Sequence, residues 1–506
     1  MLLNKYIINQ MSMQAFTKKF CFFLWMFVTI DGSTDVLKRE RHSRAMNGMD
    51  LNLMFYISLC VTLFVVIGAG VYATCMVKSA EDYSVGGHRA SGTIVTGALI
   101  GTLIGGSATI GTAQLAFCVG ISAWWFTLGL GVGLIVLALF YAAPLRKQKM
   151  VTIAQFLVGH FGEKAGLITS ISSSIGIFFS IVASFLASVH LLATVFQLSI
   201  VPSILLTAFI ILGAVWGGGI NGAGLVGILK TVLVYGTLSV GGYGAYMMLG
   251  GIDGMRALFP VMPWLRMDGV GTWKAVGDLV ALVVGILTTQ TYIQAIYSAR
   301  TTTVAVSSCL TAAAIVIPIG LPAVCIGMFM RIYHPDILPV NALPLYFMEY
   351  LPSWLGGAAI MGLLLSSIGS SSGLALGVGT MLSRDLLSRF VNRLSSEKLL
   401  AMNRLCVLGV TITASIVTYI YYDALVLTLN LYSMAFRASA IIVPMTLAVF
   451  CAKRLTSSEA VVVMLGGLVP ALGSAIIGVG ISPILFGIAG SGILAFGAMM
   501  RNRSRR

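Results

Sequence analysis

Residues 97–111 read Gly-Ala-Leu-Ile-Gly-Thr-Leu-Ile-Gly-Gly-Ser-Ala-Thr-Ile-Gly, an uncharged run that contains five glycines. Glycine destabilises a helix interior by about 1 kcal/mol relative to alanine. The adjacent pair Gly105 and Gly106 therefore favours a break in the middle of an otherwise apolar helix. The same small residues also permit close packing of neighbouring helices, and both interpretations fit this run.

The composition around this run indicates a membrane protein. The chain has 506 residues, of which 58% are hydrophobic and 9% are charged. Soluble domains carry about 25% charged residues, so a soluble enzyme of several domains is excluded. Apolar runs of about 20 residues predict an all-α integral membrane protein rather than a barrel with strands of about ten residues. The expected spans, about thirteen, are 51–76, 93–115, 122–143, 165–195, 202–217, 222–249, 275–297, 304–331, 355–382, 400–420, 424–450, 457–479 and 481–500.

The distribution of lysine and arginine predicts the orientation in the membrane. Eighteen of these cations lie in the loops and the C-terminal tail on one side of the expected spans. The opposite loops hold four, namely Arg256, Arg266, Lys274 and Arg331. Cytoplasmic loops carry the excess of cations, so we expect a multi-pass protein of the cell membrane with a cytoplasmic C-terminus. The net charge of +15 therefore does not predict a nucleic-acid partner.

Residues 1–48 form a basic tail that does not fit this pattern. Its apolar stretch, 20–30, is too short to span a membrane and resembles the core of a signal peptide. No small-residue cleavage site follows this stretch. A natural start at Met46 or Met49 is the alternative explanation, and the sequence leaves both open.

A second uncharged run lies five expected helices after the first. Residues 284–291 read Val-Gly-Ile-Leu-Thr-Thr-Gln-Thr. Secondary transporters often place their binding site where the paired helices of an inverted repeat are broken. The two runs therefore predict a site between them.

Three further motifs carry a resemblance to a known family. Residues 81–89 read Glu-Asp-Tyr-Ser-Val-Gly-Gly-His-Arg, residues 152–162 contain Thr-Ile-Ala-Gln-Phe and Phe-Gly, and Arg384-Asp385-Leu386 follows a serine-rich run. Together these motifs resemble the sodium/solute symporter family, over about residues 51–455.

The resemblance implies a five-plus-five inverted-repeat core of the LeuT type. The implied divisions are a tail at 1–48, an additional first span at 51–76, the first repeat at 93–249, the second repeat at 275–450 and two additional spans at 457–500. The implied function is uptake of a small solute driven by a sodium gradient. The implied partners are the lipid bilayer and the solute, with no organic cofactor and no catalytic residues.

The family resemblance also implies a sodium site at the first break. Its ligands would be the carbonyls of Gly101 and Ile104 and hydroxyls from the serine-rich run of the ninth span. Oxygen ligands suit a hard cation. The register of that run is ambiguous, so its candidates are Ser366, Ser367, Ser370 and Ser371. Alternatively, these serines only bond to neighbouring carbonyls within packed helices.

Two cations, Lys230 and Arg437, lie within expected spans, while every acidic residue lies in a loop, a tail or a span end. A charge in the middle of a span costs about 2.5–3.5 kcal/mol and usually faces a cavity or a partner. The family carries an Asp where Gly227 stands here and a Gln where Lys230 stands. We therefore hypothesise that the Lys230 ammonium replaces sodium and exchanges a proton. The alternative is a lysine that extends to the membrane surface.

Arg437 predicts the class of solute. A guanidinium stays charged and binds carboxylates through two hydrogen bonds, so an intramembrane arginine indicates an anionic solute. Its alternative role is to cap backbone carbonyls at an irregular turn. Further candidates for the solute site are Ser107, Thr109, Thr289, Gln290 and Gln294.

We therefore expect a symporter-like protein, and not an enzyme, that moves a small, anionic organic solute by alternating access. The coupling ion is Na⁺ or H⁺, or coupling is absent. The alternatives are a sodium-coupled symporter of a neutral solute and a non-transporting solute sensor on the same scaffold. A channel is disfavoured, because the sequence has no selectivity motif or ring of charges.

Overall fold

The computed structural model describes residues 53–74, 88–215, 219–387, 396–451, 454–478 and 482–503. The tail at 1–48 and the first part of the 81–89 motif lie outside the described residues. Within the described part of the chain all regular structure is helical, apart from a single parallel bridge between Ala90 and Ala299. The expected all-α fold is confirmed.

Each segment expected to span the membrane coincides with one helix or a short succession of helices. The first spans correspond to α3 (Leu53–Thr74), to α5 (Gly92–Leu103) with η3 (Ser107–Gly111) and α6 (Thr112–Val119), and to α7 (Trp125–Val136) with η5 (Leu137–Tyr141) and α8 (Ala142–Lys147). Next come α10 (Glu163–Phe196), α11 (Ile200–Val215), α12 (Gly219–Met248), and α15 (Thr272–Leu287) with α16 (Gln290–Ser298). The remaining spans are α17 (Thr302–Tyr333), α19 (Ser353–Met381) with η7 (Leu382–Leu386), α20 (Ser396–Ile420), α21 (Val426–Phe450), α22 (Ser457–Ile477) and α23 (Pro483–Arg503).

Short elements connect these helices. They are η4 (Gly120–Trp124), α9 (Ile153–Phe161), α13 (Gly251–Leu258), α14 (Val261–Trp264), η6 (Pro339–Asn341) and α18 (Ala342–Glu349). By length and apolar composition, nine helices within the described residues can cross a membrane, or up to ten when α15 and α16 count as one bent span.

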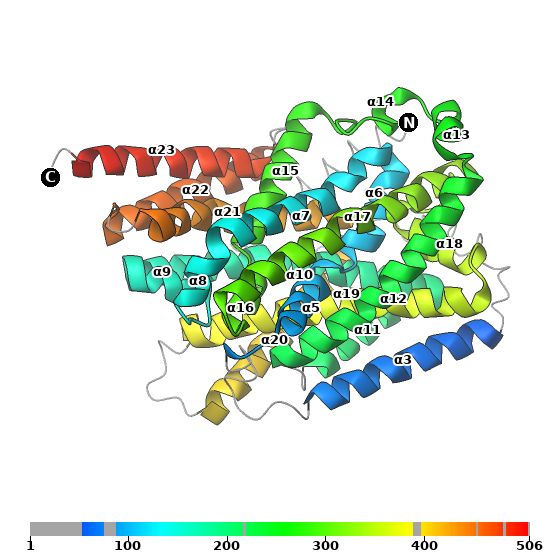
Figure 1. The fold of residues 1–506 in the computed structure, drawn as a ribbon, viewed down its shortest axis with the longest axis horizontal. Helices are drawn as coiled ribbons and strands as arrows, with labels where there is room; N and C mark the ends of the chain where they lie inside the picture. Colours follow the sequence, from blue (N-terminus) through cyan, green and yellow to red (C-terminus); the bar gives the residue numbers. More distant parts are fainter. Residues whose placement is uncertain are drawn as a thin grey trace.

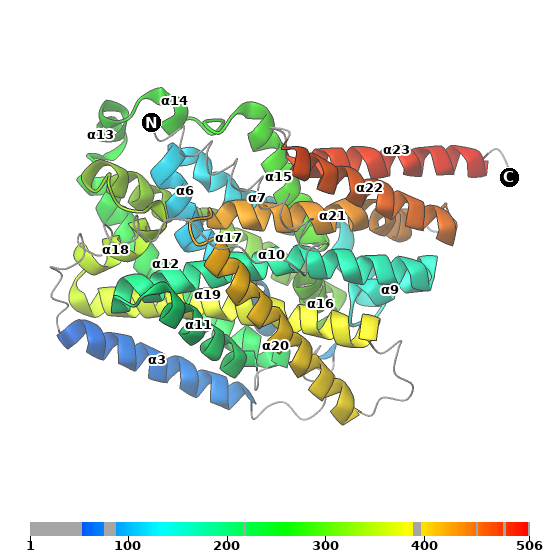
Figure 2. The same ribbon diagram turned by 180° about the vertical axis from the view of Figure 1, so that it is seen from behind.

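The bundle is centred on α10. Figures 1 and 2 show α3 at one edge of the bundle and α22 and α23 at the opposite edge, with α10 and α19 between them. Helix α10 packs against α19 and α21, and almost all of its length is buried. Large apolar side chains are instead exposed on the outer helices, among them Phe64, Phe209 and Phe496. Such a surface is suited to lipid.

The first expected break is confirmed. Helix α5 ends at Leu103, and the chain leaves helical geometry at Ile104 before η3 begins. A Cβ on Gly105 would collide with the Ser370 side chain, and one on Gly106 would lie 2.6 Å from the Ala187 Cβ. The glycines therefore permit both the break and the close approach of α10 and α19, so both interpretations of this run apply.

The second expected break is also present. Helix α15 ends at Leu287 and α16 begins at Gln290, with a bend of 40° between them. The Thr288 N–H still bonds to the Gly285 carbonyl, at 3.3 Å, so the interruption is short. Two broken spans thus face the interior of the bundle.

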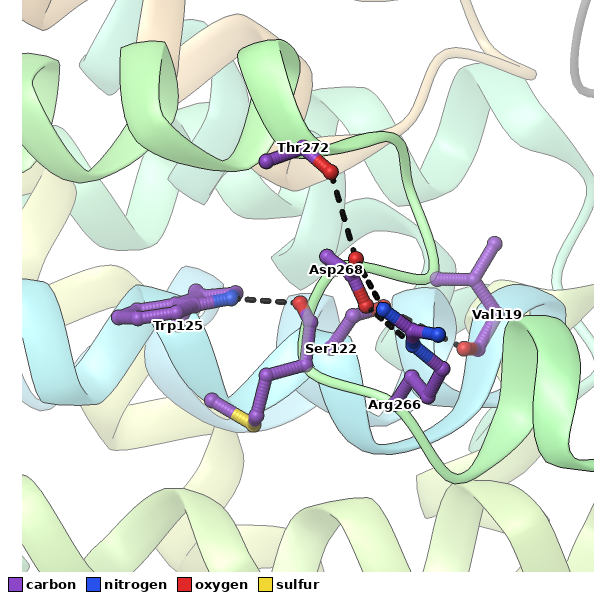
Figure 3. A network of polar contacts seen from close by, with 7 residues as sticks. Val119, Ser122, Trp125, Arg266, Asp268 and Thr272 are labelled. Carbon is purple, nitrogen blue, oxygen red and sulfur yellow. Dashed lines mark hydrogen bonds and ion pairs between the residues drawn. The ribbon is translucent and has the colours of Figure 1, made fainter.

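A polar network fixes the corner between α6 and α7, as Figure 3 shows. The Trp125 indole donates to the Met267 carbonyl at 2.6 Å, and Arg266 forms two hydrogen bonds of 2.8 Å with Asp268. Hydrogen bonds from Arg266 lower the pKa of the Asp268 carboxyl. Gly120 has a φ of +75°, and a Cβ there would meet the Trp264 carbonyl. This network holds the start of α7, and with it Phe126, in place.

At the other end of the broken spans, residues 88–90 pair with residues 298–300 in what we term the seam. The Ala90 N–H donates to the Ser298 carbonyl and the Arg300 N–H to the Ala90 carbonyl, both at 3.0 Å. The buried Arg146 side chain donates to the Ala299 carbonyl, and to the His88 carbonyl at 3.2 Å. The seam joins the start of α5 to the end of α16.

Candidate functional site

A small cavity lies beside the first break. It is lined by Thr102, Leu103, Gly105, Ser107, Phe126, Leu130, Ser180, Ser184, Tyr292, Leu374, Asn430, Met434 and Arg437. These residues come from both broken spans and from α7, α10, α19 and α21. Among the lining residues that the structure describes, none is acidic. We term this space the central cavity.

Arg437 supplies the single formal charge among these lining residues. Its side chain is fully buried, at 1% exposure, on α21. One terminal nitrogen donates to the Ser433 hydroxyl at 2.9 Å, while Nε has no hydrogen-bond partner within the described residues. No ion pair in this part of the chain involves Arg437. The guanidinium thus retains a donor for a ligand, and its observed bond is to a hydroxyl rather than to a backbone carbonyl.

Besides Arg437, only one of the residues predicted to bind the solute lines the central cavity. Ser107 lies there with a buried hydroxyl that has no partner in the described residues. Thr109 and Thr289 instead donate to the carbonyls of Gly105 and Gly285, at 3.0 and 2.6 Å. These two hydroxyls are therefore hydrogen-bonded within their own spans, and neither residue lines the central cavity.

The two predicted glutamines also lie away from the cavity lining. Gln290 accepts from the Ile153 N–H at 2.9 Å and donates to the Val151 carbonyl at 3.0 Å. It therefore fixes the start of α9 against α16. Gln294 is buried but is not among the lining residues.

Five polar lining residues were not predicted: Thr102, Ser180, Ser184, Tyr292 and Asn430. Asn430 and Arg437 are seven residues apart on one helix, a spacing that places them on one face. This spacing from Arg437 is the feature of the sequence from which Asn430 could have been predicted. No pattern in the sequence distinguishes Ser180 and Ser184 from the other serines of α10, because the distinction arises from packing against α21.

The predicted cation site is assembled in part. The Ser366 hydroxyl donates to the Ile104 carbonyl, and the Ser370 hydroxyl donates to the Thr102 carbonyl at 3.1 Å. Ser366 and Ser370, one from each of the two alternative registers, therefore both bond to carbonyls at the break. Ser371 bonds within its own helix to the Ser367 carbonyl at 3.0 Å, and the buried Ser367 hydroxyl has no partner among the described residues.

Lys230 lies against this cluster. Its Nζ donates to the Ser366 carbonyl at 3.1 Å, and a Cβ on Gly369 would lie 3.2 Å from Nζ. The side chain is 2% exposed, so it points into the protein and not toward the membrane surface. The ammonium thus lies where α12, α19 and the break meet.

One turn earlier, Gly227 allows α12 to approach α5. A Cβ on Gly227 would collide with the Gly97 carbonyl and lie 3.0 Å from the Gly101 Cα. Gly101 therefore serves as a packing surface for α12. A larger side chain at position 227 would require the two helices to separate.

A family model described as the sodium:solute symporter family matches residues 83–467. The chain belongs to the sodium:solute symporter family. As a member, it is a multi-pass membrane protein of the symporter class, with a small solute as its substrate. No curated protein is a significant match in sequence.

Solved transporters share the fold of this sodium:solute symporter family member. A Na⁺-coupled sialic acid symporter in a substrate-bound outward-open state matches with 18% identity and a TM-score of 0.74, over 89% of this chain and 97% of its own. Mhp1, a nucleobase-cation-symport-1 family transporter, matches in a closed conformation with bromovinylhydantoin bound, with 12% identity and a TM-score of 0.55 over 84% and 95% of the two chains. Its inward facing conformation matches with 13% identity and a TM-score of 0.52, over 82% and 92%.

Gly106 provides a test of the break in this family member. Replacing Gly106 with alanine places a Cβ 2.6 Å from Ala187 and 2.7 Å from the Ser367 hydroxyl. Overpacking of this kind costs about 1–3 kcal/mol, so we expect a lower melting temperature and reduced uptake. Gly236→Ala is the matched control, because a Cβ at position 236 meets nothing within 4 Å. Equal melting temperatures for the two variants would contradict the packing role of Gly106.

Proposed function

We propose that this sodium:solute symporter family member carries a small anionic organic solute by alternating access, with Arg437 as the group that binds the solute's carboxylate. The observation that carries this proposal is the buried guanidinium, which has no acidic partner within the described residues and has one unbonded Nε. A buried charge of this kind is costly unless it is compensated. A carboxylate compensates it through two charge-assisted hydrogen bonds.

The proposed architecture is the five-plus-five inverted repeat inside about thirteen spans. The breaks at 104–106 and 288–289 support it, because they lie five spans apart and both adjoin the centre of the bundle. The proposed divisions remain 51–76 for the additional first span, 93–249 and 275–450 for the repeats, and 457–500 for the last two spans. The excess of cations supports a cytoplasmic C-terminus.

We further propose that the Lys230 ammonium takes the place of sodium at the first break. Three contacts support this proposal: Nζ with the Ser366 carbonyl, the Ser366 hydroxyl with the Ile104 carbonyl, and the Ser370 hydroxyl with the Thr102 carbonyl. The Ile104 carbonyl, one of the two that a cation would use, is therefore already bonded to a donor of this chain. Transport would then be coupled to protons or to no cation.

The test is uptake by purified protein in proteoliposomes, with labelled short-chain carboxylates, amino acids and sugars. Sodium and proton gradients are imposed separately. We expect uptake of a carboxylate that persists when sodium is replaced by choline. Accumulation of a carboxylate under a sodium gradient alone would overturn the role of Lys230. Uptake of neutral sugars with no carboxylate transport would instead identify a sodium-coupled symporter of a neutral solute and overturn the role of Arg437.

A further inference from the structure

A chain of hydrogen bonds links Arg437 to Asn430 across α10 and α21. Arg437 donates to the Ser433 hydroxyl at 2.9 Å. The Ser180 hydroxyl lies 2.7 Å from the Ser433 hydroxyl and also contacts Asn430 Oδ1. Ser180, Asn430 and Arg437 line the central cavity, and Ser433 is fully buried behind it.

With the Asn430 oxygen facing Ser180, the hydrogens in this chain have one consistent direction. A guanidinium donates and never accepts, so Ser433 accepts from Arg437. A hydroxyl has a single hydrogen and an amide oxygen only accepts, so the Ser180 hydrogen goes to Asn430 Oδ1. The Ser433 hydrogen then goes to Ser180. With the amide placed as in the structure, the hydrogen bonds thus run from Arg437 through Ser433 and Ser180 to the oxygen of the Asn430 amide.

The consequence is that Asn430 presents its NH₂ group to the central cavity. Its oxygen is occupied by Ser180, and its Nδ2 forms no hydrogen bond within the described residues. The unbonded Nε of Arg437 is a second donor. The hydroxyls of Ser107, Ser184 and Tyr292 can donate or accept. The lining side chains thus offer two groups that can only donate, Nδ2 of Asn430 and Nε of Arg437, beside three hydroxyls that can donate or accept.

We propose that the solute carries a hydroxyl or carbonyl oxygen on the second or third carbon of its carboxylate chain, and that Asn430 binds this oxygen. The inference rests on the proposed function, since it assumes that the carboxylate binds Arg437. An ammonium at the same carbon only donates, so it would meet the NH₂ of Asn430 without an acceptor and would be repelled by Arg437. The central cavity would therefore select hydroxy or oxo acids and reject the corresponding amino acids.

The experiment compares acids that differ in one group. The melting temperature of the full-length protein is measured against the concentration of propionate, lactate and alanine, and of butyrate, 3-hydroxybutyrate and 3-aminobutyrate. One additional hydrogen bond strengthens binding by about three- to tenfold. We expect one hydroxy acid to bind more tightly than its unsubstituted partner by this factor, and neither amino acid to stabilise the protein.

Variants separate the role of Asn430 from general effects on folding. Ser180→Ala releases the amide oxygen, so the amide can turn and accept a hydrogen bond. The discrimination between the hydroxy acid and the corresponding amino acid should then weaken, while the response to propionate or butyrate remains. Asn430→Asp places a carboxylate beside Arg437 and should abolish the response to all acids. Ser439→Ala is the control, because within the described residues the Ser439 hydroxyl bonds to the Ala435 carbonyl of its own helix, at 2.6 Å, and to no other group.

The outcomes distinguish the two proposals. Equal binding of hydroxy and unsubstituted acids, unchanged by Ser180→Ala, would overturn the role of Asn430 and leave that of Arg437 intact. Stabilisation by an amino acid greater than that by its hydroxy acid would also overturn it. Absence of stabilisation by every acid, in the wild type and in all variants, would overturn the carboxylate site and with it this inference.

Discussion

Replacing Arg437 with glutamine is expected to reduce carboxylate uptake by at least about 30-fold. Removing one partner of a buried, hydrogen-bonded charge pair costs about 2–5 kcal/mol, and each 1.4 kcal/mol is a factor of ten. Glutamine keeps a hydrogen-bond donor near Ser433, so the fold should tolerate the change better than it tolerates alanine. The measurement is initial uptake rate against carboxylate concentration in proteoliposomes.

Arg437→Lys refines this prediction. Lysine keeps the charge but replaces a planar group by a compact ammonium, which cannot form two parallel hydrogen bonds with a carboxylate. We expect a steep rise in KM for the carboxylate. Arg256→Gln is the control, since Arg256 is exposed on the short helix α13. An unaltered KM in Arg437→Lys would show that the guanidinium has a structural role only.

The second large effect is expected at Lys230. Lys230→Ala removes the ammonium from the Ser366 carbonyl and leaves the first break without a positive charge. If this ammonium replaces sodium, the variant should lose sodium-independent uptake together with its dependence on pH. Uptake is measured from about pH 5.5 to 8.5, with sodium or choline as the salt cation.

A second substitution tests whether the Lys230 ammonium takes the place of a sodium ion. Lys230→Gln introduces the residue that the family resemblance places at this position, and we expect it to make uptake sodium-stimulated. Thr231→Ala is the control, because this buried neighbour bonds only to the Gly227 carbonyl of its own helix, at 2.7 Å. If uptake and its pH profile are the same in Lys230→Ala as in the wild type, Lys230 does not occupy the cation site.

The sequence predicted the apolar helices and both breaks, because these features depend on local composition. Apolar runs of about 20 residues determine which segments lie in the membrane. Gly105 and Gly106 weaken the helix at the position where the chain leaves helical geometry. Lys230 and Arg437 were identifiable because a charge within an apolar run is rare and costly.

The hydroxyls of the site were harder to predict, since their roles depend on packing. Thr109 and Thr289 satisfy their hydroxyls on carbonyls four residues earlier, as serine and threonine commonly do in helices. Ser180 has the same local surroundings in sequence, but α21 brings Asn430 and Ser433 to it. Gln290 was expected at the solute site and instead bonds to Val151 and Ile153, which are far away in the chain.

The seam bears on how fast such a carrier works. Its contacts are made by backbone atoms, by the Arg146 side chain and by the His88 ring, whose Nδ1 lies 2.7 Å from the Tyr297 carbonyl, and none of these contacts involves a residue of the central cavity. We expect the seam to open during transport, and these bonds then break in a loaded and in an empty carrier alike. The part of the activation barrier that these bonds contribute should therefore not depend on the cargo. We expect substitutions at Arg146 to change turnover and substitutions at Arg437 to change selectivity.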